Sequence, residues 1–90
     1  MFYTYIIFSE KLNKYYVGHT DNILRRMDEH NSGKSNFTKL GKPWSLKYTE
    51  QFSNRSEAMK REFEIKSRKS KRFIEKLISS AGLERPVSLC

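Results

Sequence analysis

The feature that most constrains the fold is a pair of short segments near the N-terminal end, both rich in tyrosine and β-branched residues. Residues 2–8 are aromatic or β-branched throughout. A second segment at 15–18, two tyrosines and a valine followed by a glycine, comes after a polar break of six residues. Neither segment has a helical period, and the break has the length of a hairpin loop. The pattern therefore predicts two neighbouring antiparallel strands.

Downstream, the sequence predicts a helix, an irregular stretch, one more strand and two further helices. We expect a helix at 22–31, capped by Asp21, and then an irregular stretch at 32–43. A strand at 44–52 should follow, with Leu46, Tyr48 and Phe52 on one face. The next helix should be capped by Ser53, Asn54 or Ser56 and run to about Lys66, and the last should run from Ser70 to about Gly82. The predicted fold class is α+β, with a small three-stranded antiparallel sheet flanked by three helices in the order β-β-α-β-α-α. Residues 1–82 form one domain, and residues 83–90, which include Pro86, are expected to be a flexible tail.

The composition points to a polyanionic partner. With 90 residues, the chain has room for one modest core, which its six Phe, five Tyr and one Trp can fill. It carries 18 Lys and Arg against 10 Asp and Glu, a net charge of +8. Five of the seven residues at 66–72 are basic. Such a run suits a phosphate backbone, because Lys and Arg release counterions from nucleic acid, but a solvated helix junction explains it equally well.

Cysteine usage and hydropathy bear on the compartment. The one cysteine, Cys90, excludes an internal disulfide framework and a zinc site built from several thiolates. The apolar run at 2–8 is too short for a membrane span and lacks the basic start of a signal peptide. We therefore expect a cytoplasmic protein that does not associate with membranes.

In the second predicted helix, a carboxylate falls among apolar residues. On a helical wheel of about 100° per residue, Glu62 lies within the arc formed by Ala58, Met59, Phe63 and Ile65. A carboxylate in that arc has to be paired or turned to a cleft, because burying it alone costs several kcal/mol. Glu62 is therefore a candidate ligand for a hard cation such as Mg²⁺, and a salt bridge to a nearby Arg or Lys is the structural alternative.

The same construction separates two adjacent arginines in the first predicted helix. Leu24 and Met27 help to define its buried side, and Arg25 points away from that side. Arg26 and His30 lie together at the edge of the apolar arc, one helical turn apart. An arginine at a core margin can reach into a cleft with its planar fork of donors, whereas a lone histidine there is more often a core residue. As a pair, they are candidates for one wall of a site.

The tyrosines of the two N-terminal strands supply a third set of candidates. Tyr5 shares a strand face with Tyr3 and Ile7, and Tyr16 shares a face with Gly18. Most strand tyrosines serve core packing. Gly18, however, indicates that another group approaches the backbone closely at this point.

Taken in order, these residues resemble the GIY-YIG nuclease family, and in particular its small standalone bacterial members, over about residues 3–78. Residues 3–5 stand where the family has Gly-Ile-Tyr, and residues 16–18 stand where it has Tyr-Ile-Gly. Arg26, eight positions after the second motif, falls at the catalytic arginine of the family, and Glu62 falls at its metal-binding glutamate. Several family nucleases also carry an asparagine well after that glutamate, a position with no counterpart in this chain.

The resemblance implies a metal-dependent endonuclease that hydrolyses phosphodiester bonds with structure-directed or weak sequence specificity, in DNA repair, recombination or nucleic-acid turnover. It implies one Mg²⁺ or Mn²⁺ on Glu62, an arginine that neutralises phosphoryl charge, and a tyrosine base whose pKa the arginine and the metal would lower. The implied partner is nucleic acid, DNA ahead of RNA, and the protein is a monomer or a homodimer. The catalytic residues expected from it are Tyr5, Tyr16, Arg26, His30 and Glu62. The expected nucleic-acid contacts are Gly18, His19, Lys34, Lys39, Lys66, Arg68, Lys69, Lys71 and Arg72.

Two other classes of function stay open at this point. A nucleic-acid-binding module with this fold would use the run at 66–72 and the loop at 32–42 on phosphate and cut poorly or not at all. A basic structural protein of a ribonucleoprotein would use the same residues for packing. In that second class, Glu62 would form a salt bridge rather than face a cleft.

Overall fold

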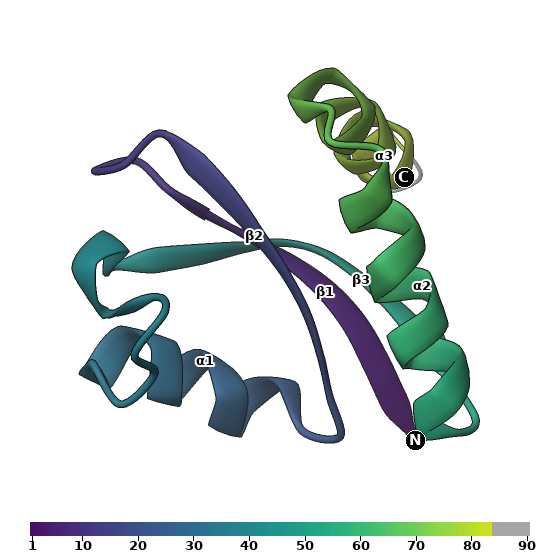
Figure 1. Cartoon of the computed structure of the whole chain (residues 1–90), viewed down its shortest axis with the longest axis horizontal. Coiled ribbons are helices and arrows are strands. Elements are labelled where there is room, and N and C mark those ends of the chain that lie inside the picture. Colours follow the sequence, from purple (N-terminus) through teal and green to yellow (C-terminus); the bar gives the residue numbers. More distant parts are fainter. Residues whose placement is uncertain (84–90) are drawn as a thin grey trace.

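The computed structural model describes residues 1–83, which form a three-stranded sheet with helices on both of its faces (Figure 1). The strands are β1 (Phe2–Ser9), β2 (Lys14–Thr20) and β3 (Trp44–Phe52). The helices are α1 (Ile23–Ser32), α2 (Arg55–Ser67) and α3 (Lys71–Leu83), and a short 3-10 turn, η1 (Lys39–Gly41), precedes β3. The predicted α+β class and the order β-β-α-β-α-α are confirmed.

β1 is the central strand, and β2 and β3 both run antiparallel to it. The predicted hairpin between the first two strands is therefore confirmed. Because β1 has neighbours on both sides and helices on both faces, Tyr5, Ile6 and Ile7 are at most 1% exposed. β2 forms one edge of the sheet, and side chains that belong to opposite faces can meet along that edge.

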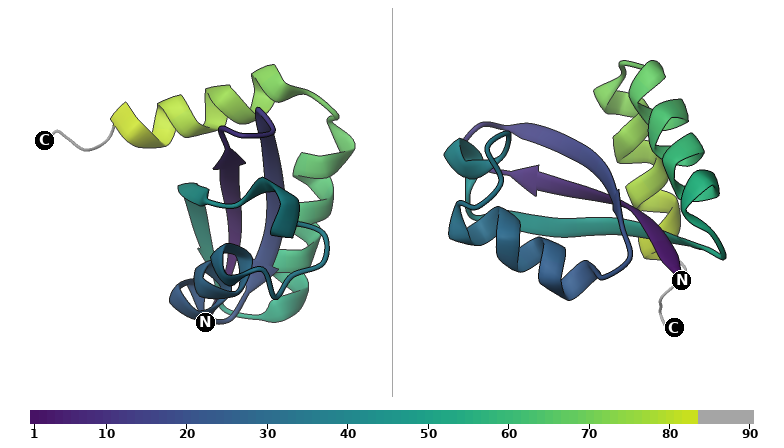
Figure 2. Two further views of the ribbon diagram at one scale, coloured as in Figure 1. Left: turned by 90° about the vertical axis from the view of Figure 1, so that its left-hand side faces the viewer. Right: turned by 60° about the horizontal axis from the view of Figure 1, so that its bottom comes forward.

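The alternation of side chains along β1 divides the core into two parts. Tyr5 and Ile7 pack with Trp44 and with residues of α1. Ile6 packs with Ile65 of α2 and with apolar residues of α3 on the opposite face. α1 alone therefore covers one face of the sheet, and α2 and α3 together cover the other (Figure 2).

Two of the helix starts follow the expected N-cap chemistry, with one correction. Asn22, not Asp21, caps α1, because its side-chain oxygen accepts a hydrogen bond from the backbone N–H of Arg25 at 2.9 Å. Asp21 pairs instead with the Arg25 guanidinium at 2.6 Å. Asn54, one of the three candidates, caps α2 by accepting from the backbone N–H of Glu57.

Three apolar residues that the helical wheels placed on buried faces are in fact exposed. Leu24 of α1 is 84% exposed, Phe63 of α2 is 73% exposed, and Met59 of α2 is exposed as well. The sheet has only three strands, so each helix touches it through a narrow stripe rather than through a full apolar arc. In α1 that stripe contains Met27 and His30, and Leu24 lies beside it.

The predicted common face of Leu46, Tyr48 and Phe52 is also wrong. The register between β1 and β3 shifts after Ile6, so that Tyr48 pairs with Ile6 but Leu46 pairs with Ile7. A β-bulge of this kind opposes two residues to one and breaks the alternation of side chains. Tyr48 therefore packs with the α2 and α3 side of the core, whereas Leu46 lies on the other face.

The C-terminal prediction is tested only in part. Leu83, placed in the tail by the sequence, is the last residue of α3. The rest of that predicted tail, 84–90, lies outside the described residues. Among the helices described up to residue 83, none combines the length and the apolar character that crossing a bilayer requires.

Candidate active site

The Tyr5 hydroxyl lies over Gly18 of the neighbouring strand, and this approach determines where the site forms. Tyr5 and Gly18 are cross-strand partners in β1 and β2. A Cβ atom added at Gly18 would lie 2.6 Å from the Tyr5 hydroxyl oxygen and 2.8 Å from Cζ. The predicted close approach to Gly18 is therefore confirmed. The absence of a side chain lets the Tyr5 ring extend from the central strand across β2.

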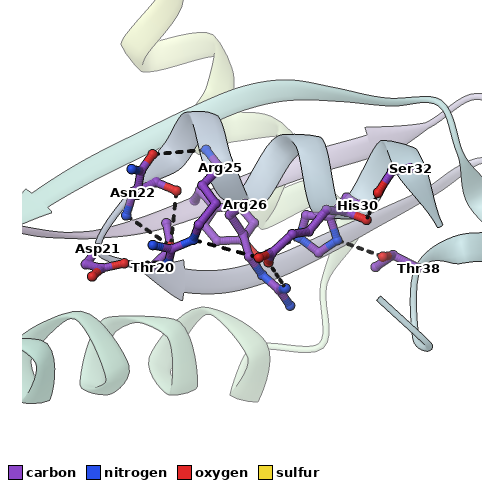
Figure 3. A network of polar contacts seen from close by, with 10 residues as sticks. Thr20, Asp21, Asn22, Arg25, Arg26, His30, Ser32 and Thr38 are labelled. Carbon is purple, nitrogen blue, oxygen red and sulfur yellow. Dashed lines mark hydrogen bonds and ion pairs between the residues drawn. The ribbon is translucent and has the colours of Figure 1, made fainter. Parts of the chain in front are cut away.

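A chain of hydrogen bonds runs from Arg26 through Tyr5 and His30 to Thr38. Figure 3 labels Arg26, His30 and Thr38 and marks the bond between the last two. Arg26 Nε donates to the Tyr5 hydroxyl at 3.3 Å, and that hydroxyl lies 2.8 Å from His30 Nε2. His30 Nδ1 lies 2.7 Å from Thr38 Oγ1. The buried Tyr5 hydroxyl needs an acceptor for its proton, and among the described residues His30 Nε2 is the acceptor within reach. The consistent arrangement therefore has Tyr5 donating to Nε2 and neutral His30 donating from Nδ1 to Thr38.

Burial controls the protonation of this chain. Desolvation raises the pKa of Tyr5 to about 12, although the neighbouring Arg26 acts in the opposite direction. Arg26 thus lowers the pKa of Tyr5 as expected, but desolvation outweighs the arginine and leaves the pKa above its ordinary value. Desolvation, with Arg26 adding to it, lowers the pKa of His30 to about 4. Burial disfavours the charge of Arg26, but hydrogen bonds to Glu29 and Tyr5 raise its pKa and keep it charged.

We expect His30 to make the stability of the protein depend on pH below about 6.5. The folded state keeps His30 neutral down to about pH 4, whereas the unfolded chain protonates it near its ordinary pKa of 6.5. The contribution of His30 is therefore complete above pH 6.5 and is lost as the pH falls. By about pH 5 it should have cost about 2 kcal/mol of unfolding free energy. Urea unfolding of the wild type and of His30→Gln, above pH 6.5 and at about pH 5, measures how much more unfolding free energy the wild type loses between the two conditions. Identical pH dependence in the two proteins would refute the prediction.

Glu62 reaches the edge strand β2 from α2 and is paired through both of its oxygens. His19 Nδ1 lies 2.6 Å from Oε1, and Lys66 Nζ lies 2.5 Å from Oε2. The Glu62 side chain is 18% exposed, which agrees with its predicted place on the packed side of the helix. The salt bridge considered as the structural alternative is thus present.

The five expected catalytic residues form one connected group at the β2 edge. The Tyr16 ring contacts the His30 ring edge-on, with 5.4 Å between the ring centroids. The same Tyr16 ring also contacts Lys66, whose Nζ lies 5.6 Å from the ring centroid. Lys66 in turn holds Glu62, whose charge also raises the pKa of Tyr5. The group therefore joins side chains of α1, β1, β2 and α2 around the strand that has no outer neighbour.

A divalent ion at this site would depend on Glu62. Within residues 1–83, no group of three or more His, Cys, Asp or Glu is placed to hold a metal ion. A single carboxylate suits Mg²⁺ or Mn²⁺, which take oxygen ligands and commonly complete their shell with water and substrate phosphate. The donor chemistry therefore fits, on the condition that Lys66 leaves Oε2.

The residues expected to contact nucleic acid divide into two groups. Gly18 is buried under Tyr5 and His19 holds Glu62, so both belong to the site itself. Arg68 stacks over Phe73, and Lys71 donates to the Asn13 side chain in the β1–β2 loop. The remaining expected contacts are all exposed side chains, at Lys34, Lys39, Lys66, Arg68, Lys69, Lys71 and Arg72.

Thr38 is a site residue that the sequence did not reveal. It is completely buried in the stretch predicted only as irregular, and its backbone carbonyl accepts from Trp44 Nε1 at 2.7 Å. Asn31 fastens the same loop by bonding both the backbone N–H and the carbonyl of Trp44. A hydroxyl in a loop carries no periodic pattern, so nothing in the sequence distinguished Thr38 from its neighbours.

Comparison with known proteins agrees with this geometry. Residues 1–76 match the family model described as the GIY-YIG catalytic domain. The chain belongs to the GIY-YIG family. The resemblance inferred from the two tyrosine motifs, Arg26 and Glu62 is thereby confirmed, and the protein has the domain of a nuclease family.

Several proteins similar to this chain carry the name UPF0213. A UPF0213 protein of Staphylococcus haemolyticus is 47% identical over 66 residues, which cover 72% of this chain and 79% of the relative. One of Halobacterium salinarum is 45% identical over 53 residues, covering 58% and 69%. The solution NMR structure of a UPF0213 protein of Bacillus halodurans has 35% identity and a TM-score of 0.57, covering 92% of this chain and 88% of that one. The GIY-YIG fold is therefore common to this chain and that structure.

Proposed function

We propose that the protein is a metal-dependent endonuclease that hydrolyses phosphodiester bonds of nucleic acid at the β2 edge. The observation that supports this best is the connected group at the β2 edge, in which the Arg26–Tyr5–His30 chain is linked to Glu62 through Tyr16 and Lys66. A charged arginine and a carboxylate beside hydroxyl groups are the components that phosphoryl transfer to water requires.

Each residue has a distinct role in this proposal. Arg26, which stays charged, neutralises the charge that develops on the phosphoryl oxygens. Tyr5 is 1% exposed and bonded to both Arg26 and His30, so it positions them. Tyr16 is only half-buried, which makes it the tyrosine better suited to orient the attacking water. A divalent ion held by Glu62 would polarise the scissile phosphate and stabilise the leaving oxygen.

The proposal extends to the substrate and its setting. The exposed basic side chains of 66–72 contact the phosphate backbone and contribute affinity without reading sequence. Cleavage is structure-directed or weakly specific, with DNA ahead of RNA, and serves repair, recombination or turnover in the cytoplasm. The working unit is a monomer or a homodimer.

Substitution of Glu62 tests the proposal directly. Glu62→Gln should lower Mg²⁺-dependent cleavage of single- or double-stranded DNA or RNA at least about 100-fold, because the metal contributes several kcal/mol to the transition state. Salt-sensitive binding of the same substrates should survive. The matched control is Glu64→Gln, an exposed carboxylate on the same helix that pairs with Arg61. It should cleave as the wild type does.

A protein that binds nucleic acid without cutting it is the second candidate, because both Glu62 oxygens are paired, as expected above for a basic structural protein of a ribonucleoprotein. Wild-type protein that binds nucleic acid with strong salt dependence, but cuts neither DNA nor RNA in single- or double-stranded form, would support that alternative. Cleavage by Glu62→Gln at the wild-type rate would instead refute the role given to the carboxylate.

A further inference from the structure

Lys66 lies where the two halves of the site meet. Its ammonium is 2.5 Å from Glu62 Oε2 and 5.6 Å from the centroid of the Tyr16 ring. Glu62 and Lys66 are one turn apart on α2, so the same short helix carries the carboxylate and the cation that covers it. Building on the proposed function, we propose that Lys66 is a gate that occupies the metal-binding oxygen of Glu62 until substrate phosphate draws it away.

The geometry makes the ammonium and a divalent ion competitors. His19 holds Oε1 at 2.6 Å and is 24% exposed, whereas Lys66 on Oε2 is 47% exposed. Oε2 is therefore the oxygen that an incoming ion takes, because it has the more exposed partner to displace. An ion bound there would lie against the positive charge of Lys66, and the two like charges repel at that separation. A metal ion therefore binds only when the ammonium leaves.

Lys66 is able to leave. Its side chain is 47% exposed, whereas the Glu62 side chain is 18% exposed, so the lysine is the mobile partner of the pair. Four flexible methylene groups let the ammonium swing without any backbone movement. A phosphate at the β2 edge would offer the ammonium a new partner while supplying oxygen ligands to the ion.

The consequence is positive coupling between metal and substrate. Nucleic acid that attracts Lys66 exposes Oε2 and raises the affinity of Glu62 for the ion, and by reciprocity the bound ion favours nucleic acid. Without substrate, the protein binds metal weakly. The gate thus confines metal loading to the complex in which cleavage is required.

The test is a titration with Mn²⁺ alone, without nucleic acid, at low ionic strength and followed by electron paramagnetic resonance. Lys66→Met should bind Mn²⁺ about two- to fivefold more tightly than the wild type, the factor expected for the loss of a half-exposed ion pair. Lys60→Met is the matched control. Lys60 is an exposed lysine of the same helix. Its substitution changes the net charge by the same amount and should leave the affinity for Mn²⁺ unchanged.

Further variants separate the gate from the metal site. In a Glu62→Gln background, Lys66→Met should have no effect on Mn²⁺ affinity. Glu62-dependent binding of equal strength in the wild type and Lys66→Met would overturn the gate and leave the endonuclease proposal intact. Absence of Glu62-dependent binding in both would overturn the metal site and the gate together. Lys66→Gln, which keeps a polar side chain, should repeat the gain seen with methionine and exclude an effect of packing.

Discussion

Replacing Arg26 with alanine is expected to lower the single-turnover cleavage rate about 100- to 1,000-fold. Loss of one preorganised donor to developing negative charge has effects of this size in other enzymes. The Arg26 guanidinium already has a defined orientation, because Nε donates to Tyr5 and one terminal nitrogen donates to Glu29 at 2.7 Å. The measurement is cleavage at saturating protein, with equilibrium binding determined separately.

The neighbouring Arg25 provides a control of equal charge. Arg25 lies on the exposed side of α1, 53% exposed, and pairs with Asp21 and Glu29. Arg25→Ala should therefore cleave within about threefold of the wild type, as expected for the loss of a surface charge. Equal losses in the two variants would indicate that the arginines act through general attraction of a polyanion. Arg26 would then have no special place in the site.

Gly18→Ala is expected to lower the free energy of unfolding by about 1–3 kcal/mol, the usual cost of overpacking a filled core. The added methyl group would lie 2.6 Å from the Tyr5 hydroxyl oxygen. Tyr5 cannot easily turn away, because its ring is rigid, its strand is central and its hydroxyl is bonded to His30. We expect the displaced hydroxyl to release Arg26 as well, so cleavage should fall further than the loss of stability explains.

A double-mutant cycle isolates the contact between Gly18 and Tyr5. In a Tyr5→Phe background the atom nearest to the new methyl group is absent, so Gly18→Ala should cost less there than in the wild type. Urea unfolding of the four proteins gives the coupling energy. If Gly18→Ala costs the same in both backgrounds, the hydroxyl is not the source of the strain, and the emphasis on this contact rather than on the ring carbon Cζ at 2.8 Å is wrong.

In α1, the direction of a side chain is a local property of the sequence, whereas its burial depends on long-range packing. The helical period correctly distinguished Arg26 and His30 from Arg25, because the direction of a helical side chain depends on spacing along the chain. The same period placed Leu24 on the buried side, where it is 84% exposed. Burial depends on how much of a helix the sheet covers, and the local pattern does not contain the width of a three-stranded sheet.

The site shows the same division. Glu62 stood out because a carboxylate lay within an apolar arc, and Gly18 stood out as a glycine within a strand. Lys66 was expected to contact nucleic acid and Tyr5 to take part in catalysis, but the pairing of Lys66 with the carboxylate and of Tyr5 with the glycine was not visible in the sequence. In the structure Lys66 covers the oxygen that a metal requires, and the Tyr5 ring fills the space above the glycine.

By itself, the sequence determined the order of the elements, the hairpin, the family and the residue types of the site, because alternation, helical period and motif spacing are properties of neighbouring positions. Only the tertiary structure decided the pKa of Tyr5 and the pairing of Glu62. His19 and Glu62 are 43 positions apart in the chain, and Tyr5 and His30 are 25 apart, yet each pair is within hydrogen-bonding distance. Such contacts depend on where the fold brings distant residues, and so does the desolvation that raises the pKa of Tyr5.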